Sequence, residues 1–197
     1  MWANNPSNTI RTAWKAAATY WLERWLSAGL QASRARWNLI AQSTLFSRFD
    51  ARPGPGERYW TDGWSGYPAA ADRLVSDIRE SRVRNALLVG GDVHTNYVCD
   101  VKADFADPGS ATVATEFCGT SITSPSMPQS RIDAVLPENP HVVFADSTRR
   151  GYVLLTLEQD RCTAELRTIE DARDPATAVA TRARFVVEDG RPGAQQA

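Results

Sequence analysis

The sequence has few cysteines and histidines, which narrows the kinds of site it can form. Its 197 residues include three cysteines, none in a CxxC pair, and two histidines. An odd and widely spaced cysteine set argues against a disulfide framework and against a structural zinc site. We therefore expect Cys99, Cys118 and Cys162 to be buried thiols, with a bridge between the first two left open. Two histidines also exclude a histidine-rich metal centre built from this chain alone.

The sequence also has very little net charge and no long apolar run. Lys and Arg number 22 against 23 Asp and Glu, which gives a formal net charge of -1. This balance offers no electrostatic basis for a nucleic-acid partner or for an anionic membrane surface. No apolar run approaches the ~18 residues of a membrane-spanning helix, and residues 1–6 lack the basic and then apolar pattern of a signal peptide. The 43% hydrophobic and 23% charged residues are ordinary for one globular domain.

The domain organisation follows from the placement of polar residues, proline and glycine. Residues 1–12 are polar and interrupted by Pro6, which indicates a disordered leader. Residues 189–197 contain two glycines and a proline, and we expect a disordered tail there. The folded domain is therefore predicted to span residues 13–188. No internal repeat and no low-complexity tract interrupts it.

Aromatic residues mark the first predicted helix. Apolar residues recur at three- and four-residue steps over 13–31, which is the period of an amphipathic helix. Trp14, Trp21 and Trp25 lie on one stripe of this helix. Such a stripe could line a cofactor site, but a packed helix face is the favoured interpretation.

A strand, a helix and a strand follow in the order of a parallel βαβ unit. We predict a strand over 37–41, a helix over 68–80 with Pro68 in its first turn, and a buried strand over 87–89. The predicted fold class is α/β or α+β, with a mixed sheet and helices outside. Later strands are predicted at 97–102, 112–118, 141–145, 151–158, 161–169 and 183–188, with 158–160 forming a hairpin turn.

The most informative stretch carries an Asp and a His directly after the buried strand 87–89. Two glycines end this strand, and Asp92 and His94 follow them. In open α/β sheets, ligands bind beyond the carboxyl ends of the strands. If the backbone is extended, side chains two residues apart point to one side, so this carboxylate and imidazole could share a metal ion. The alternative is a turn-capping Asp and a core histidine.

Other polar residues have weaker signals. Asp62 could approach the metal or shape a substrate site, or it could belong to an Asp-Gly turn beside packed tryptophans. Arg149 and Arg150 could bind a phosphate, but solvated surface arginines are the favoured interpretation. His141 is expected to have a structural role. Three hydroxyl residues lack a nucleophile elbow and indicate a hydrogen-bonded loop near the site: Ser121, Thr123 and Ser124.

Several blocks of this sequence belong together by their order and spacing. They lie at 36–42, 60–68, 85–97, 116–124 and 139–141, with 150–152 following. Taken together, these blocks resemble the PhoD-like family of metallophosphoesterases, the alkaline phosphatase D family, and the resemblance covers residues 20–187. Several ordered blocks are more specific than any one motif.

The resemblance implies a fold, a metal centre and a reaction. The implied fold is the C-terminal half of a calcineurin-like metallophosphoesterase, in which two sheets lie between helices. The family holds iron with calcium at the strand ends, and its members are typically exported. Asp92 and His94 stand in the place of the final Gly-His-x-His motif, with Asp92 where the first histidine is usual, so both are implied metal ligands. A metal-activated hydroxide would attack phosphorus in a phosphoester substrate.

One departure from the family pattern affects the expected activity. The first metal-binding motifs of the family, rich in Asp and Asn, would lie before the segment that corresponds to Trp14, and they are absent. We expect a truncated protein whose missing half, if it exists as a separate chain, is its partner. The competing hypothesis is an inactive remnant or interaction fragment that keeps the C-terminal fold. A serine hydrolase using Ser121 or Ser124 with His94 and Asp92 is a poorer third.

Overall fold

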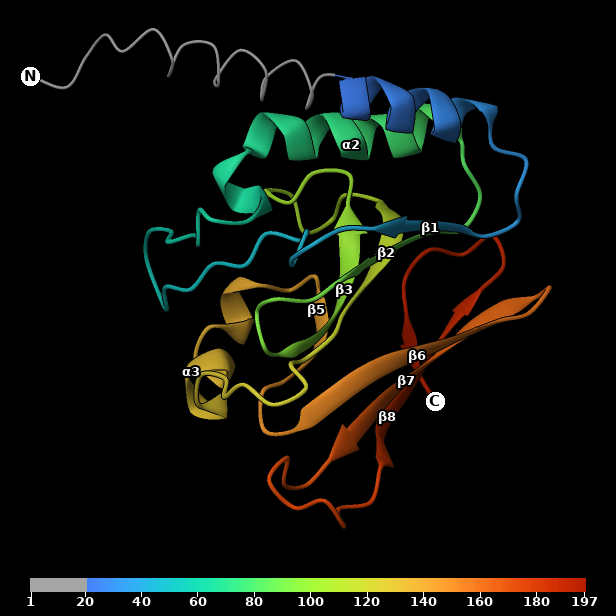
Figure 1. Ribbon diagram of the computed structural model, residues 1–197. Helices are drawn as coiled ribbons and strands as arrows, with labels where there is room; N and C mark the ends of the chain where they lie inside the picture. The colour runs from blue at the N-terminus through green and yellow to red at the C-terminus, as the bar shows by residue number, and fades with distance from the viewer. Residues whose placement is uncertain (1–20) are drawn as a thin grey trace, which may run out of the picture.

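The computed structural model describes residues 21–197, which form two β-sheets and a layer of helices (Figure 1). The expected leader at 1–12 and Trp14 lie outside the described residues. All three cysteines are buried and free, so the optional Cys99–Cys118 bridge is not formed. Within residues 21–197, no helix has the length and apolar character needed to span a membrane.

The first sheet is mixed and has five strands in the order β1-β2-β4-β3-β5. β2 is parallel to both β1 and β4, and β3 is antiparallel to β4 and β5. The predicted βαβ unit is therefore confirmed, because helix α2 (Pro68–Ser81) connects the parallel pair β1 and β2. The strands are β1 (Asn38–Ala41), β2 (Ala86–Gly90), β3 (Asn96–Lys102), β4 (Thr112–Cys118) and β5 (Val142–Asp146).

The second sheet is antiparallel, in the order β6-β7-β8-β9. The predicted hairpin is present, since the Glu158 N–H donates to the Arg161 carbonyl (2.9 Å) between β6 and β7. The strands are β6 (Arg150–Leu157), β7 (Arg161–Ile169), β8 (Ala180–Glu188) and β9 (Gln195–Gln196).

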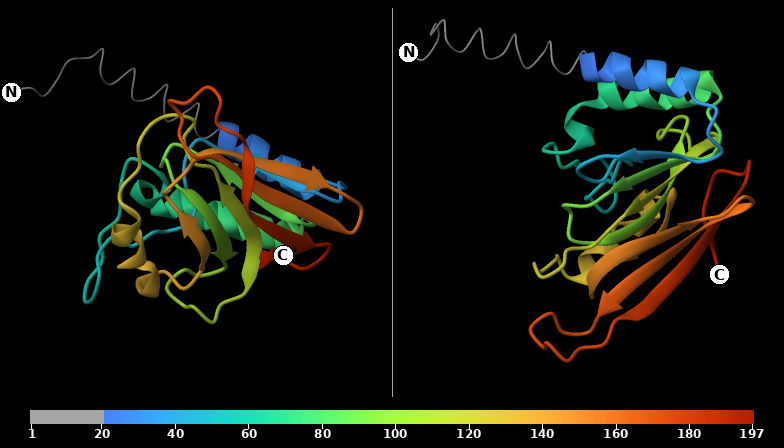
Figure 2. Two further views of the ribbon diagram at one scale, coloured as in Figure 1. Left: turned by 90° about the horizontal axis from the view of Figure 1, so that it is seen from below. Right: turned by 45° about the vertical axis from the view of Figure 1, so that its right-hand side comes forward.

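The helices cover one face of the five-stranded sheet, and the second sheet covers the other (Figure 2). The described chain begins in a helix that ends at residue 32 and lies beside α2 (Pro68–Ser81). A salt bridge between Arg73 and Glu23 (2.5 Å) links these two helices. Three short helices lie in loops: Trp64–Gly66, α3 (Gln129–Asp133) and Leu136–Glu138. The mixed architecture confirms the predicted fold class.

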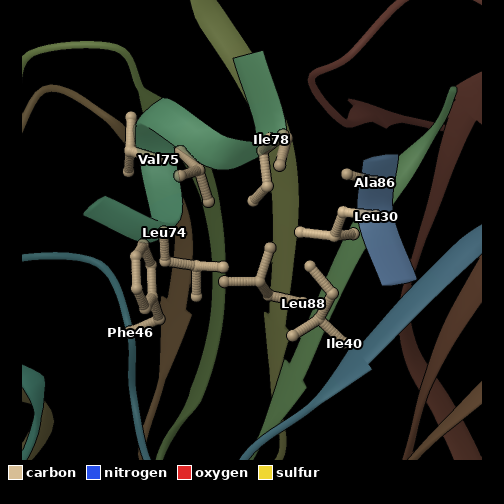
Figure 3. Close-up of a cluster of buried hydrophobic side chains, with 10 residues drawn as sticks. Leu30, Ile40, Phe46, Leu74, Val75, Ile78, Ala86 and Leu88 are labelled. Atoms are coloured by element: carbon tan, nitrogen blue, oxygen red, sulfur yellow. The ribbon is translucent and has the colours of Figure 1, made fainter. Parts of the chain in front are cut away.

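β2 supplies side chains to both hydrophobic layers. Leu88 points into the helix-side core with Leu74 and Ile78 of α2, as Figure 3 shows. Leu87 points the opposite way and packs with Phe117 against the inner face of the second sheet. Both leucines are fully buried. Because successive side chains of a strand alternate between faces, one continuous apolar run serves both cores.

The aromatic stripe of the first helix is mostly exposed, contrary to the expected packed face. Trp21 and Trp25 are 66% and 73% exposed. Leu26 and Leu30 pack into the helix-side core instead. The expectation was wrong for these two tryptophans because the helix packs into the core through these leucines.

The tail is ordered, which corrects the expected disorder at 189–197. The Asp189 carboxylate accepts hydrogen bonds from Asn85 (2.6 Å) and Arg84 (2.8 Å). Farther along, Ala194 is buried in the core between the sheets, and β9 adds an edge strand to β8. Composition predicted a flexible segment, but these tertiary contacts outweigh the entropy that favours disorder.

A buried carboxylate holds the loop that follows β1. Glu116, in β4, is fully buried and accepts hydrogen bonds from the backbone N–H groups of Phe46 (2.6 Å) and Ser47 (2.8 Å). Burial raises the pKa of Glu116, and these two donors lower it in part. In the same loop, the Gln42 side chain accepts hydrogen bonds from the Thr44 N–H and from an indole N–H, both at 2.9 Å. The loop is thereby fixed against β4.

This loop crosses the carboxyl end of β2 at a glycine. A Cβ atom at Gly90 would overlap the Thr44 carbonyl oxygen and the Gln42 side-chain amide. A Cβ atom at Gly91 would meet only the Gly119 carbonyl oxygen, at 3.9 Å. The two glycines are therefore not equivalent: the first permits the close crossing, and the second has space around it.

We predict that Gly90→Ala destabilises the protein while Gly91→Ala does not. The added methyl group at residue 90 forces the loop away from β2, which costs about 1–3 kcal/mol for overpacking of this kind. The same change at residue 91 should stay within about 0.5 kcal/mol of the unchanged protein. Denaturant unfolding of the three proteins measures both values. Equal stability of the two variants would contradict the close crossing.

Candidate functional site

The candidate site lies in the turn between β2 and β3. Asp92 and His94 follow the carboxyl end of β2, and both have positive φ angles, of 67° and 57°. This conformation costs about 1–2 kcal/mol for a residue with a side chain. The turn is not extended, so the premise that two residues two apart share a face is wrong here. Their placement beyond the end of a parallel strand is as predicted.

The His94 ring has one nitrogen fixed by a backbone carbonyl. Its Nδ1 lies 3.0 Å from the Pro125 carbonyl oxygen. A carbonyl oxygen can only accept a hydrogen bond, so Nδ1 carries the proton. In the neutral ring, Nε2 then has a free lone pair. Histidines that bind metals are commonly held in this way, with the second nitrogen donating to a carbonyl or carboxylate.

Two segments of the chain besides its own turn contact His94 and its neighbour Thr95: the loop at 119–126 and the start of β6. Thr120 Oγ1 donates to the His94 carbonyl (2.9 Å), and Thr95 Oγ1 hydrogen-bonds Ser126 Oγ (2.8 Å). Arg150, the first residue of β6, donates to the same His94 carbonyl (3.2 Å). The surface interpretation of Arg150 is therefore wrong. Residue type gave little signal for Thr120 and none for Pro125, because the latter acts through its backbone.

Asp92 is exposed and lies near a buried thiol. The pKa of Cys118 is raised, chiefly by burial and further by the charges of Glu116 and Asp92. The protonated thiol donates to the Gly91 carbonyl oxygen at 3.3 Å. Cys118 is therefore a neutral thiol that supports the turn in which Asp92 lies.

The donor types at this turn suit a metal ion, but their number is small. A carboxylate oxygen and an imidazole nitrogen fit a divalent or trivalent ion of intermediate hardness. Within residues 21–197, however, no group of three or more His, Cys, Asp or Glu side chains could hold a metal ion. At this turn the described residues place two candidate ligands, Asp92 and His94, outside any such larger group.

Asp62 and Arg149 have other surroundings. Asp62 is exposed in a turn just before the short helix Trp64–Gly66, so this stretch is not extended either. Trp64 of that helix packs edge-on against Phe46, with ring centroids 5.0 Å apart. Arg149 pairs with Glu170 (2.9 Å) at the surface. In the described chain, no hydrogen bond or ion pair joins the Asp62 or Arg149 side chain to Asp92 or His94.

The remaining polar candidates have structural partners. Ser121 Oγ donates to the Ser124 carbonyl (2.5 Å), and no serine hydroxyl hydrogen-bonds the His94 ring within residues 21–197. The hydrogen-bonded loop is therefore present, and a serine–histidine catalytic pair is not. His141 is buried and its Nε2 donates to the Arg48 carbonyl (2.6 Å). Burial lowers its pKa, as expected for a structural histidine.

An apolar cavity of about 460 Å³ lies between the two sheets beside this turn. Gly90, Gly91 and Thr120 line its rim near the candidate site. Its walls are mostly aliphatic and come from both sheets: Leu39, Val89, Phe117, Val153 and Leu155. Asp92 and His94 do not line this cavity.

Comparisons with known proteins agree with the resemblance in the sequence. The family model of the PhoD-like phosphatases matches residues 22–166. Alkaline phosphatase D of Bacillus subtilis (strain 168) is 33% identical over 174 residues, which is 87% of this chain and 30% of that protein. A solved structure of PhoD superposes with a TM-score of 0.79 at 30% identity, covering 88% of this chain and 34% of that one.

The three matches cover different lengths of sequence, and all three are to PhoD-like proteins. The chain spans about a third of the length of both relatives. The family model covers well over half of the chain, including β2, the turn with Asp92 and His94, and Arg150. The chain belongs to the PhoD-like phosphatase family.

Proposed function

We propose that this chain forms part of a metal-dependent phosphoester hydrolase and contributes Asp92 and His94 to its metal centre. The observation that carries the proposal is the His94 ring, whose Nδ1 is held by the Pro125 carbonyl while Nε2 keeps a lone pair. Membership of the PhoD-like phosphatase family supports the reaction class. Iron and calcium are the proposed metals, from family resemblance.

The residues of the turn have separate roles in this proposal. Asp92 supplies an exposed carboxylate, and His94 supplies an oriented imidazole nitrogen. A bound metal ion would supply Lewis acidity that activates water and offsets charge on phosphoryl oxygens. Asp62 and Arg149 remain proposed substrate contacts. For Arg149 this requires release from Glu170, whose side chain is 81% exposed and screened by solvent.

The other ligands are proposed to come from a further polypeptide segment that binds one open side of the fold. Within residues 21–197, β1 pairs only with β2, and β6 pairs only with β7. Leu39 of β1 and Leu155 of β6 line one cavity, so the two unpaired edges lie on the same side. A strand edge of this kind readily pairs with another chain.

Apolar side chains accompany these open edges. Trp25 and Leu39 together line a second cavity of about 280 Å³ between the first helix and β1. Leu39, Tyr152 and Leu154 are each between 42% and 47% exposed. Exposed apolar surface that adjoins unpaired strand edges favours a protein partner. The sequence of the relatives outside the match, about two thirds of their length, is the proposed equivalent of that segment.

We predict that the 197-residue chain alone hydrolyses phosphoesters barely and that adding the complementary segment restores turnover. Two protein ligands leave most coordination positions of an iron or calcium ion to water. The assay uses a chromogenic phosphate ester with iron and calcium, for the chain alone and after co-expression with the part of the Bacillus subtilis relative outside the match.

Three outcomes separate the hypotheses for this assay. Turnover by the co-expressed pair alone supports the proposed division of ligands. Comparable turnover by the single chain would mean that its site is complete and that the partner proposal is wrong. A stable but inactive complex favours the alternative function, an interaction fragment that keeps the fold without catalysis.

We further predict that Asp92→Asn or His94→Asn lowers the metal affinity of the active assembly by ~10-fold to 100-fold. Each change removes a proposed ligand, and turnover should fall with it at limiting metal. Asp72→Asn is the matched control, because Asp72 is exposed on α2 and its nearest ion-pair distance is 4.0 Å. Metal content and turnover are measured together. Control-like values for both site variants would contradict the ligand assignment.

A further inference from the structure

Arg150 lies at the centre of the hydrogen bonds that surround His94. Its Nη1 lies within hydrogen-bond distance of the carbonyls of His94 (3.2 Å) and Ser124 (2.9 Å) and of Ser121 Oγ (3.0 Å), so its two N–H groups are shared among three acceptors. Its Nη2 donates to the Ser147 carbonyl at 2.5 Å. One guanidinium group thus connects the turn after β2, the loop at 119–126 and the residues before β6.

All of these acceptors are neutral, which is unusual for a charged group. Within the described chain, Arg150 forms no ion pair, whereas its neighbour Arg149 pairs with Glu170 at the surface. Burial lowers the pKa of Arg150, and the charge of Asp146 raises it in part. Desolvation of the guanidinium is a cost. Hydrogen bonds from a charged donor offset that cost.

The hydrogen bonds of Arg150 affect both the backbone and the ring of His94. At the backbone, the donor to the His94 carbonyl supports the left-handed conformation, together with Thr120 Oγ1. At the ring, the effect is indirect. Arg150 holds the Ser124 carbonyl, and the next carbonyl along the chain, that of Pro125, accepts the Nδ1 proton of His94.

We propose that Arg150 is a positioning residue that keeps the His94 ring in its Nδ1–H tautomer with Nε2 free. It acts on the backbone of His94 and on the loop whose carbonyl selects the tautomer. Under the proposed function, Nε2 is the metal ligand, so Arg150 determines whether this lone pair is available. The arrangement of the ring itself does not depend on that function.

The two histidines of the chain make this proposal measurable. The His94 ring donates from Nδ1, and the His141 ring donates from Nε2 to the Arg48 carbonyl. The two tautomers have different patterns in nitrogen–proton correlation spectra. His141 therefore serves as an internal reference for a folded protein in every sample.

The experiment records these spectra on the 197-residue chain with isotopically labelled histidine, at mildly alkaline pH and without added metal. In Arg150→Met, we expect the ratio of the Nδ1–H to the Nε2–H form of His94 to fall about fivefold or more, the factor produced by losing one ordinary hydrogen bond. Arg149→Met is the matched control, since it removes a neighbouring guanidinium and should leave both histidine patterns unchanged.

An unchanged His94 pattern in Arg150→Met, with the His141 pattern intact, would overturn the proposal. If the His141 pattern is lost, the variant has not folded, and Arg150→Lys then decides. Lysine keeps the charge and the aliphatic stem but cannot reach all four acceptors at once, so a smaller shift in the same direction is expected, and none would overturn the proposal. Because no metal or substrate is present, failure here is distinct from failure of the proposed hydrolase function.

Discussion

The double burial of β2 is the constraint on which the rest of the structure depends. This strand is parallel to a neighbour on each side and is covered by helices on one face and by the second sheet on the other. Leu88 packs into the helix-side core, and Leu87 packs into the core between the two sheets. Since both faces and both edges are occupied, the carboxyl end of β2 has a fixed position, and the turn with Asp92 and His94 starts from it.

The site is then shaped by polar groups that would be costly to bury without partners. Glu116 holds the loop after β1 through two backbone N–H groups, and that loop passes over Gly90. On the other side of the turn, Arg150 binds the carbonyls of three loops. A buried carboxylate and a partly buried guanidinium are stabilised by such hydrogen bonds. The first fixes the loop that crosses β2, and the second binds the backbone of His94.

The open side of the fold is where the proposed partner segment would bind and add its ligands to Asp92 and His94. Both sheets end there in strands whose outer edges are unpaired within residues 21–197. Trp25 and Leu39 leave apolar surface exposed along the same side. An unpaired strand edge and an exposed apolar surface both favour a neighbouring chain that would cover them.

The sequence by itself determined the family, the mixed α/β class, nearly all strands and the importance of the turn at 90–96. These follow from local patterns: apolar runs, alternation, Pro68 at the start of α2 and glycines at the end of β2. Only the tertiary structure decided that Trp21 and Trp25 are exposed, that the tail adds strand β9, and that Arg150 faces inward. Each of these depends on which surfaces meet after folding, and residue type and spacing do not encode that locally. The orientation of His94 belongs to the same class, because it is set by the Pro125 carbonyl, a backbone group that every residue has.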